Sequence, residues 1–258
     1  MANSISRCVY FGCALGQRRD VMSRTALLTQ TVFWLLFALL ICCGDVFLHA
    51  QTPGFYSIDC GSTSTETYSD YTTTIIWTPD LDIMPDGIAA TVTAPTTGEG
   101  DAYTTLRYFP GNHSKYCYPL APVEAGSSYI VRAGFWMGDR SLYATEVVDQ
   151  ISFQLIIDAY VVTLVNLSLP QARVKYSEVY VTANASRMAA CVARTTGSAA
   201  SDPPFISSLE LRPLPRTTYG GMLVQTLKYP MLMVGRSNYG APSDYPRVLR
   251  STTISLCV

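Results

Sequence analysis

The chain has 258 residues, of which 48% are hydrophobic, so it can form the packed core of one large domain or two small ones. Its formal net charge is −1 and its 18 Lys and Arg residues are not clustered, which excludes nucleic-acid binding through a basic patch. Tyrosine, threonine, serine and valine are abundant, whereas lysine and glutamate are sparse, and this balance favours strands over helices.

The first 50 residues have the order of a secretory signal. The apolar run Val32–Cys43 follows three arginines and precedes the small residue Ala50. We expect cleavage near Ala50 and a secreted chain; a start at Met22 gives a shorter, more regular signal. The alternative is an uncleaved anchor over about residues 26–48, with its N-terminus in the cytoplasm. In that case the membrane contact is through this segment alone.

The body, residues 51–215, is predicted to consist of short strands separated by turns. In "YIVRAGFWMGD" the alternation places Tyr129, Val131, Ala133 and Phe135 on one face. The apolar stretch 153–169 contains Gln, Asp and Asn and is rich in β-branched residues, so we expect two buried strands rather than a membrane span. The regular spacing of such stretches is typical of an all-β sandwich or barrel.

The stretch "PPFISSLELRPL" is predicted to be one strand. Phe205, Leu209 and Leu211 alternate with more polar residues, and Pro213 is expected to end the strand because it lacks an N–H donor. Residues 216–258 mix short apolar runs with Gly, Pro and Asn. We interpret them as an incomplete second half, an edge hairpin or an irregular tail.

Few residues could carry catalysis. There are two histidines: His49 lies in the signal and His113 lies inside an Asn-His-Ser triplet. A histidine-based triad or metal site is therefore disfavoured, no C-x-x-C or phosphate-binding motif occurs, and no cofactor or metal is expected. Paired carboxylates keep a β-sandwich glycoside hydrolase open as an alternative. The available glutamates are Glu124, Glu146, Glu178 and Glu210. The alternation around Glu178 and Glu210 is better explained by a solvated strand face.

Three N-x-S triplets begin at Asn112, Asn166 and Asn184. In an exported chain they predict N-glycosylation, and each Asn should then lie in a loop or on an exposed strand face.

Five stretches resemble, in order, the malectin-like domain of plant receptor-like kinases. They are "GFYSIDCG", "LRYFPGNHSKYCYPL", "YIVRAGFWMGD", "ISFQLIIDAYVVTLV" and "PPFISSLELRPL". The resemblance implies a jelly-roll type malectin-like β-sandwich over 51–215. It also implies a non-catalytic extracellular recognition module whose ligand is a cell-wall carbohydrate or a secreted peptide or protein, with a possible receptor partner.

The resemblance also implies specific residue roles. It pairs Cys60 with Cys117 in a disulfide and makes Cys191 a buried thiol. Animal malectin holds a sugar with aromatic residues and an aspartate, and the comparable ligand-binding positions here are Trp136 and Asp202. The family's second sandwich begins in "SDYPRVLRSTTISLCV" and is then lost. A truncated receptor fragment without a function of its own is therefore a further alternative.

Overall fold

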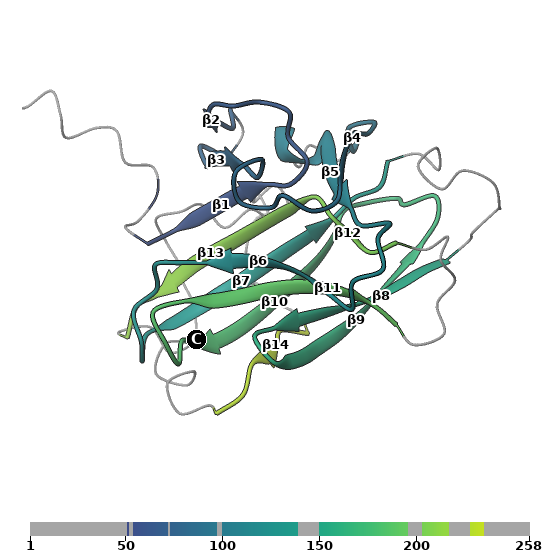
Figure 1. Cartoon of the computed structure of the whole chain (residues 1–258). Coiled ribbons are helices and arrows are strands. Elements are labelled where there is room, and N and C mark those ends of the chain that lie inside the picture. The colour runs from purple at the N-terminus through teal and green to yellow at the C-terminus, as the bar shows by residue number, and fades with distance from the viewer. Residues whose placement is uncertain are drawn as a thin grey trace, which may run out of the picture. The chain divides into compact units, whose positions relative to one another are not determined.

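A computed structural model of the chain (Figure 1) describes residues 51, 54–71, 73–96, 100–138, 150–195, 203–216 and 228–234. The chain divides into two compact units, Met1–His49 and Ala50–Val258, and all described residues lie in the second. The described residues form strands and one short 3-10 helix, η1 (Asp101–Tyr103), which confirms the all-β prediction. Among them there is no helix with the length and apolar character of a membrane span. The predicted signal or anchor helix lies outside the described residues.

The larger sheet has seven strands in the order β14-β10-β7-β13-β1-β3-β2. Their bounds are β14 Met231–Leu232, β10 Lys175–Thr182, β7 Ser128–Phe135, β13 Ser208–Leu214, β1 Tyr56–Asp59, β3 Ile76–Pro79 and β2 Tyr68–Ser69. Neighbouring strands are antiparallel except for the parallel pair β1 and β3. Strand β14 belongs to the segment predicted as a tail or an edge hairpin, and it pairs with β10 at the edge of this sheet.

A four-stranded antiparallel sheet lies against the larger one (Figure 1), in the order β6-β11-β8-β9. Its strands are β6 Tyr116–Leu120, β11 Met188–Arg194, β8 Gln150–Ile157 and β9 Tyr160–Ser168. Strands β8 and β9 confirm that the apolar stretch 153–169 forms two strands. Only β8 is largely buried as predicted, because Tyr160, Val161 and Leu164 of β9 are exposed. A third sheet contains β12 (Phe205–Ile206), β5 (Thr105–Tyr108) and β4 (Ile88–Thr91).

The main core contains the inward side chains of the two large sheets. Tyr129, Val131, Ala133 and Phe135 face it from β7, as their alternation predicted, and alternate apolar residues of β8, including Phe153, face it from the other sheet. The Phe135 and Phe153 rings meet edge to face with centroids 5.4 Å apart. Phe205, Leu209 and Leu211 are buried in this core, as predicted.

The stretch "PPFISSLELRPL" differs from its prediction in two ways. It forms two strands in different sheets, because Ser207 interrupts it: Ser207 N–H donates to the Gly134 carbonyl and its hydroxyl accepts the Trp136 N–H at 3.0 Å. Pro213 does not end the strand, since β13 continues through it and pairs Pro213 with Tyr129. A proline is tolerated there where its missing N–H is not needed for the ladder.

The outer face of the seven-stranded sheet carries a row of charged side chains. The register places Arg132 between Glu178 and Glu210. Arg132 Nε lies 3.3 Å from Glu178 Oε1, and Nη1 lies 3.8 Å from Glu210 Oε1. Glu210 also pairs with Arg212, and both glutamates are buried. The prediction of a solvated face for Glu178 and Glu210 is therefore wrong: they belong to a buried cross-strand ion-pair ladder.

The disulfide joins Cys117 and Cys191 rather than Cys60 and Cys117. Cys117 on β6 and Cys191 on β11 are directly opposite each other, with Cα atoms 4.0 Å apart. Cys60 is a buried free thiol that follows β1 in the seven-stranded sheet. The predicted pairing is wrong because Cys117 faces its neighbour within the four-stranded sheet, and the prediction of Cys191 as a thiol fails with it.

Candidate functional site

Two concave surfaces formed by described residues lie at the same end of the sandwich. At this end β7 and β1 begin, β10 and β13 finish, and Ser128 pairs with both Thr182 and Leu214. The β6–β7 loop, the β8–β9 turn and the β10–β11 turn meet here, because Leu120 pairs with Met188, and Asp158 N–H donates to the Ala189 carbonyl. The arrowheads of β10 and β13 point toward it, on the left of Figure 1. We call it the β6–β7 end.

The larger concavity is a groove with about 1140 Å³ of empty space, including open solvent. Its walls come from the entry to β1, the β6–β7 loop and the exit of β13. Tyr56, Pro122, Val123, Tyr129, Pro213 and Leu214 provide its apolar surface. The space is open rather than enclosed, so part of any ligand bound in it would remain exposed to solvent.

Polar groups of the groove are fixed by local hydrogen bonds. The Tyr129 hydroxyl accepts the Glu124 N–H at 2.8 Å, and the Tyr56 hydroxyl donates to the Pro122 carbonyl at 3.2 Å. Ser127 donates to the Glu124 carboxylate at 3.0 Å. Ser128 Oγ differs from these groups, because it is buried and has no hydrogen-bond partner among the described residues. A buried unpaired hydroxyl is a group that a bound ligand could satisfy.

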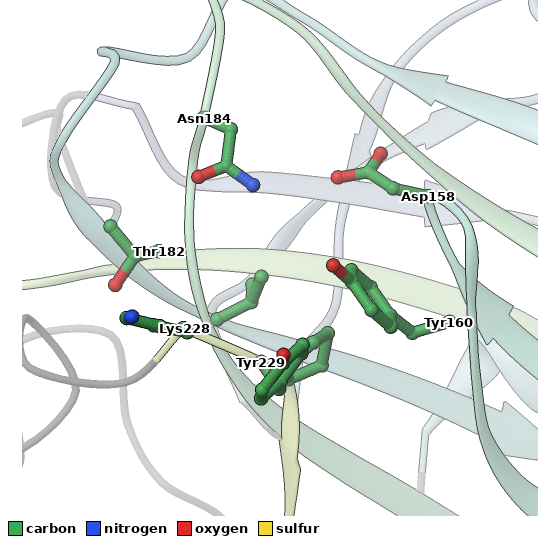
Figure 2. A pocket seen from close by; sticks show the side chains of 8 residues that line it. Asp158, Tyr160, Thr182, Asn184, Lys228 and Tyr229 are labelled. Carbon is green, nitrogen blue, oxygen red and sulfur yellow. The ribbon is translucent and has the colours of Figure 1, made fainter.

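The smaller concavity is a pocket with about 240 Å³ of empty space (Figure 2). Tyr160 and Tyr229 form its aromatic side, with ring centroids 5.4 Å apart and an interplanar angle of 77°. Both rings are accessible to solvent, with 40% of Tyr160 and 64% of Tyr229 exposed. Asp158 and Asn184 lie on the opposite side of the pocket, and their polar groups face each other (Figure 2).

The predicted ligand residue Trp136 lies at the opposite end of the sandwich, beyond the last residue of β7. It is buried in the main core, and its indole N–H donates to the Thr93 carbonyl at 2.7 Å. Asp202 lies outside the described residues. The structure therefore does not bring Trp136 to either concave surface, and a ligand-binding role for Trp136 and Asp202 stays a prediction. Sequence alternation missed the groove and pocket residues because it identifies strand faces, whereas these surfaces are built at strand ends.

All three sequon asparagines are exposed, as expected for acceptor sites. Asn112 lies in the β5–β6 loop, Asn166 on β9 and Asn184 in the β10–β11 turn. Their glycosylation stays a prediction.

Glu178 and Glu210, two of the glutamates that the structure describes, do not form an open pair of the kind that glycoside hydrolysis needs. Glu178 and Glu210 are buried and have Arg132 between them, so an internal cation occupies the space that a glycosidic oxygen would need. Glu124 lies in the groove, and Glu146 is outside the described residues. No cluster of three metal-ligating side chains occurs in the part of the chain that the structure describes.

These features define a disulfide-linked β-sandwich with two concave surfaces at one end. The sequence profile of the Malectin-like domain matches residues 58–251, and the chain belongs to this family. The predicted resemblance is thereby confirmed.

Several relatives are receptor-like kinases of Arabidopsis thaliana. The probable LRR receptor-like serine/threonine-protein kinase At1g67720 of Arabidopsis thaliana is 35% identical over 198 residues, 76% of this chain and 20% of the relative. Another such kinase, At1g05700, is 31% identical over 216 residues, 81% of this chain and 23% of the relative. The chain thus spans about a fifth of the length of these curated relatives.

Among solved structures, the ANX2 ectodomain from Arabidopsis thaliana is 18% identical, with a TM-score of 0.49 over 63% of this chain and 42% of that one. The structure of plant peptide RALF23 in complex with FER and LLG2 gives a TM-score of 0.49 at 18% identity, over 64% of this chain and 41% of that one.

Proposed function

We propose that this chain is a non-catalytic extracellular recognition module that binds a secreted peptide or protein in the groove at the β6–β7 end. The observation that carries the proposal is the groove itself, an open concavity with apolar walls where the entry to β1, the β6–β7 loop and the exit of β13 meet. Its relatives are receptor-like kinases, and ligand recognition is the role that a domain of this family would have in such a receptor.

A peptide matches the groove better than a sugar does. Its apolar side chains would cover the accessible surface of Tyr56, Pro122 and Pro213, and its backbone would offer donors and acceptors to the polar groups at the rim of the groove. Glu124 and Arg216 are exposed at the groove and provide one charge of each sign, which can set the direction of an extended chain.

A carbohydrate ligand is the second candidate, and one specific observation favours it. Tyr160 and Tyr229 present exposed aromatic rings beside hydrogen-bonding groups, and a sugar offers both apolar C–H faces and hydroxyls. This candidate uses the smaller pocket, so variants that block the groove would not impair it.

The extracellular location is part of the proposal. A chain cleaved near Ala50 would be secreted, and a chain anchored by about residues 26–48 would present the same body outside the cell. The disulfide Cys117–Cys191 agrees with an oxidising compartment. An associated receptor would be needed to transmit a signal from a secreted form.

The test begins with the full chain expressed through the secretory pathway of plant cells. The released protein is screened against a displayed library of random 12-residue peptides and against a glycan array. We expect peptide binders whose capture is lost in Ser127→Trp, which fills the groove, and kept in the matched control Thr63→Trp, an exposed position at the other end. Retention or aggregation of the chain would favour the fragment alternative. Peptide binding that survives Ser127→Trp would overturn the groove assignment.

A further inference from the structure

The pocket of Figure 2 contains an acceptor asparagine. Asn184 begins the triplet Asn184-Ala185-Ser186 and lines the pocket together with Asp158, Tyr160 and Tyr229. Figure 2 shows its carboxamide nitrogen, the atom that a glycan would modify, directed toward Asp158 and across the pocket from the two rings. A sugar attached to this nitrogen would therefore start inside the pocket rather than in bulk solvent.

The backbone is hydrogen-bonded on both sides of Asn184, which fixes the position from which its side chain starts. Ala183 N–H donates to the Ser127 carbonyl at 3.0 Å, and the Ala183 carbonyl accepts the Gly126 N–H at 2.8 Å. After Asn184, the Ser186 carbonyl accepts the Val123 N–H at 3.0 Å. The β10–β11 turn is thus bonded to the β6–β7 loop both before and after the acceptor residue.

The pocket is a shallow depression that is open to solvent, so a sugar ring would rest on its aromatic side rather than fill it. A separate small molecule needs a larger enclosed space, whereas a tethered sugar needs no large burial. The tether keeps the local concentration of the sugar high, so weak contacts are sufficient to hold it. The two tyrosines meet nearly at a right angle and leave ring surface exposed, onto which the apolar face of a sugar can pack.

Asp158 supplies the polar side. It occupies the left-handed region, with φ 54°, and its Oδ1 accepts the Ala189 N–H at 2.8 Å, so its carboxylate is fixed in position. The Ala189 N–H uses Oδ1, and a carboxylate has a second acceptor oxygen, Oδ2, which can accept the amide N–H of an N-acetyl group.

We infer that Asn184 carries an N-linked glycan whose first N-acetylglucosamine packs on Tyr160 and Tyr229 and donates its amide N–H to Asp158. The sugar then links the β10–β11 turn, β9 and the segment 228–230 as a structural part of the module. The inference rests on the export that the proposed function also assumes. If the chain's own glycan occupies the smaller pocket, the groove remains the surface that binds external ligands.

The other sequons supply the control. Asn166 lies on the exposed face of β9 and accepts the Ser152 hydroxyl at 2.8 Å, in no described pocket. Ser186→Ala and Ser168→Ala each remove one sequon while leaving its asparagine in place. A glycan that only solubilises the chain would make the two substitutions equivalent.

The experiment uses the full chain secreted from plant cells that make only high-mannose glycans, with site occupancy measured by peptide mass mapping. We expect Asn184 to be occupied, Ser186→Ala to lower Tm by about 2–4 °C, and Ser168→Ala to leave Tm unchanged. Trimming with endoglycosidase H, which leaves the first sugar, should preserve the Tm. Tyr160→Ala should lower Tm more in the protein that carries the sequon than in the Ser186→Ala background.

Three results would overturn the inference: an unoccupied Asn184, equal Tm values for the two sequon variants, or an effect of Tyr160→Ala that does not depend on the sequon. Each leaves the groove proposal standing, because peptide capture is measured separately on the same protein. Failure of export would overturn both.

Discussion

Asp80 and Arg107 form a two-point ion pair that is buried from solvent. Arg107 Nε donates to Asp80 Oδ2 at 2.6 Å and Nη2 donates to Oδ1 at 2.7 Å. The same carboxylate accepts the Gly61 N–H at 2.9 Å and the Tyr118 hydroxyl at 2.8 Å. The pair therefore joins the Ile-Asp-Cys-Gly stretch, the turn after β3, and strands β5 and β6, so the residues that carry the family resemblance act here as a structural joint.

Breaking this joint should destabilise the fold strongly. Arg107→Leu leaves a buried carboxylate without its cation, and we expect a loss of about 3–5 kcal/mol in the free energy of unfolding. Asp82→Asn changes an exposed carboxylate in the next turn and should stay within about 0.5 kcal/mol of the parent. Denaturant unfolding of the secreted proteins measures both. If Arg107→Leu were as stable as the parent, the ion pair between Asp80 and Arg107 would contribute nothing to the free energy of unfolding.

The cysteines give a second prediction. The disulfide Cys117–Cys191 closes a loop of 74 residues, so Cys117→Ala with Cys191→Ala should cost about 4 kcal/mol in the chain-entropy estimate. Burial is the main cause that raises the pKa of the Cys60 thiol, and the negative charge of Asp80 raises it further. Cys60 should therefore resist iodoacetamide in the native protein and react after unfolding. Non-reducing peptide mapping checks the pairing, and a peptide linking Cys60 to Cys117 would contradict it.

Strands and their inward residues could be predicted from the sequence because alternation reports which face of a strand is apolar. The core positions of β7 and β13 followed from this pattern. Glu178 and Glu210 could not be placed, since a polar residue in an alternating strand has the same sequence pattern whether it meets water or an arginine on the neighbouring strand. Their partner Arg132 comes from β7, between β10 and β13 in space, and only the strand order reveals that contact.

The candidate site was harder to predict for a related reason. The groove and the pocket collect residues from strand ends that are far apart in the chain, such as Tyr56, Ser128 and Leu214. Trp136 has the aromatic ring of a sugar-binding residue, yet its indole N–H is used by Thr93 within the fold. The disulfide likewise could not be predicted without knowing that β6 and β11 are neighbouring strands.

Asp59 gives a pH dependence of stability. Burial is the main cause that raises its pKa to about 6, against the lowering effect of hydrogen bonds from Thr105 and Tyr68. The folded state then binds a proton more tightly than the unfolded state, where the pKa is near 3.8. The resulting stabilisation is complete below about pH 4 and is lost as pH rises through 6, a change of about 3 kcal/mol.

The corresponding variant is Asp59→Asn, which cannot ionise. The difference in unfolding free energy between the parent and Asp59→Asn should shift by about 2–2.5 kcal/mol from pH 4 to pH 7, in favour of the variant at the higher pH. Measuring the difference removes the contribution of other carboxylates that titrate in both proteins. A difference that is constant with pH would contradict a raised pKa for Asp59.

Gly61 and Gly126 have nearly the same backbone angle but different surroundings. Alanine substitutions at the two positions can therefore distinguish the free-energy cost of backbone strain from the cost of a steric clash. Gly61 has φ +82° and Gly126 has φ +81°, so an alanine is strained at either position. A Cβ at Gly61 would lie 1.9 Å from the Leu106 carbonyl oxygen, whereas a Cβ at Gly126 would meet nothing within 4 Å. We expect Gly126→Ala to cost about 1–2 kcal/mol and to remain secreted. Gly61→Ala should prevent secretion of folded protein, because the backbone of β5 would have to move away from the joint that Asp80 and Arg107 hold. Similar secretion yields and unfolding midpoints for the two variants would show that β5 can give way, and that the Ile-Asp-Cys-Gly stretch is less tightly packed than its contacts indicate.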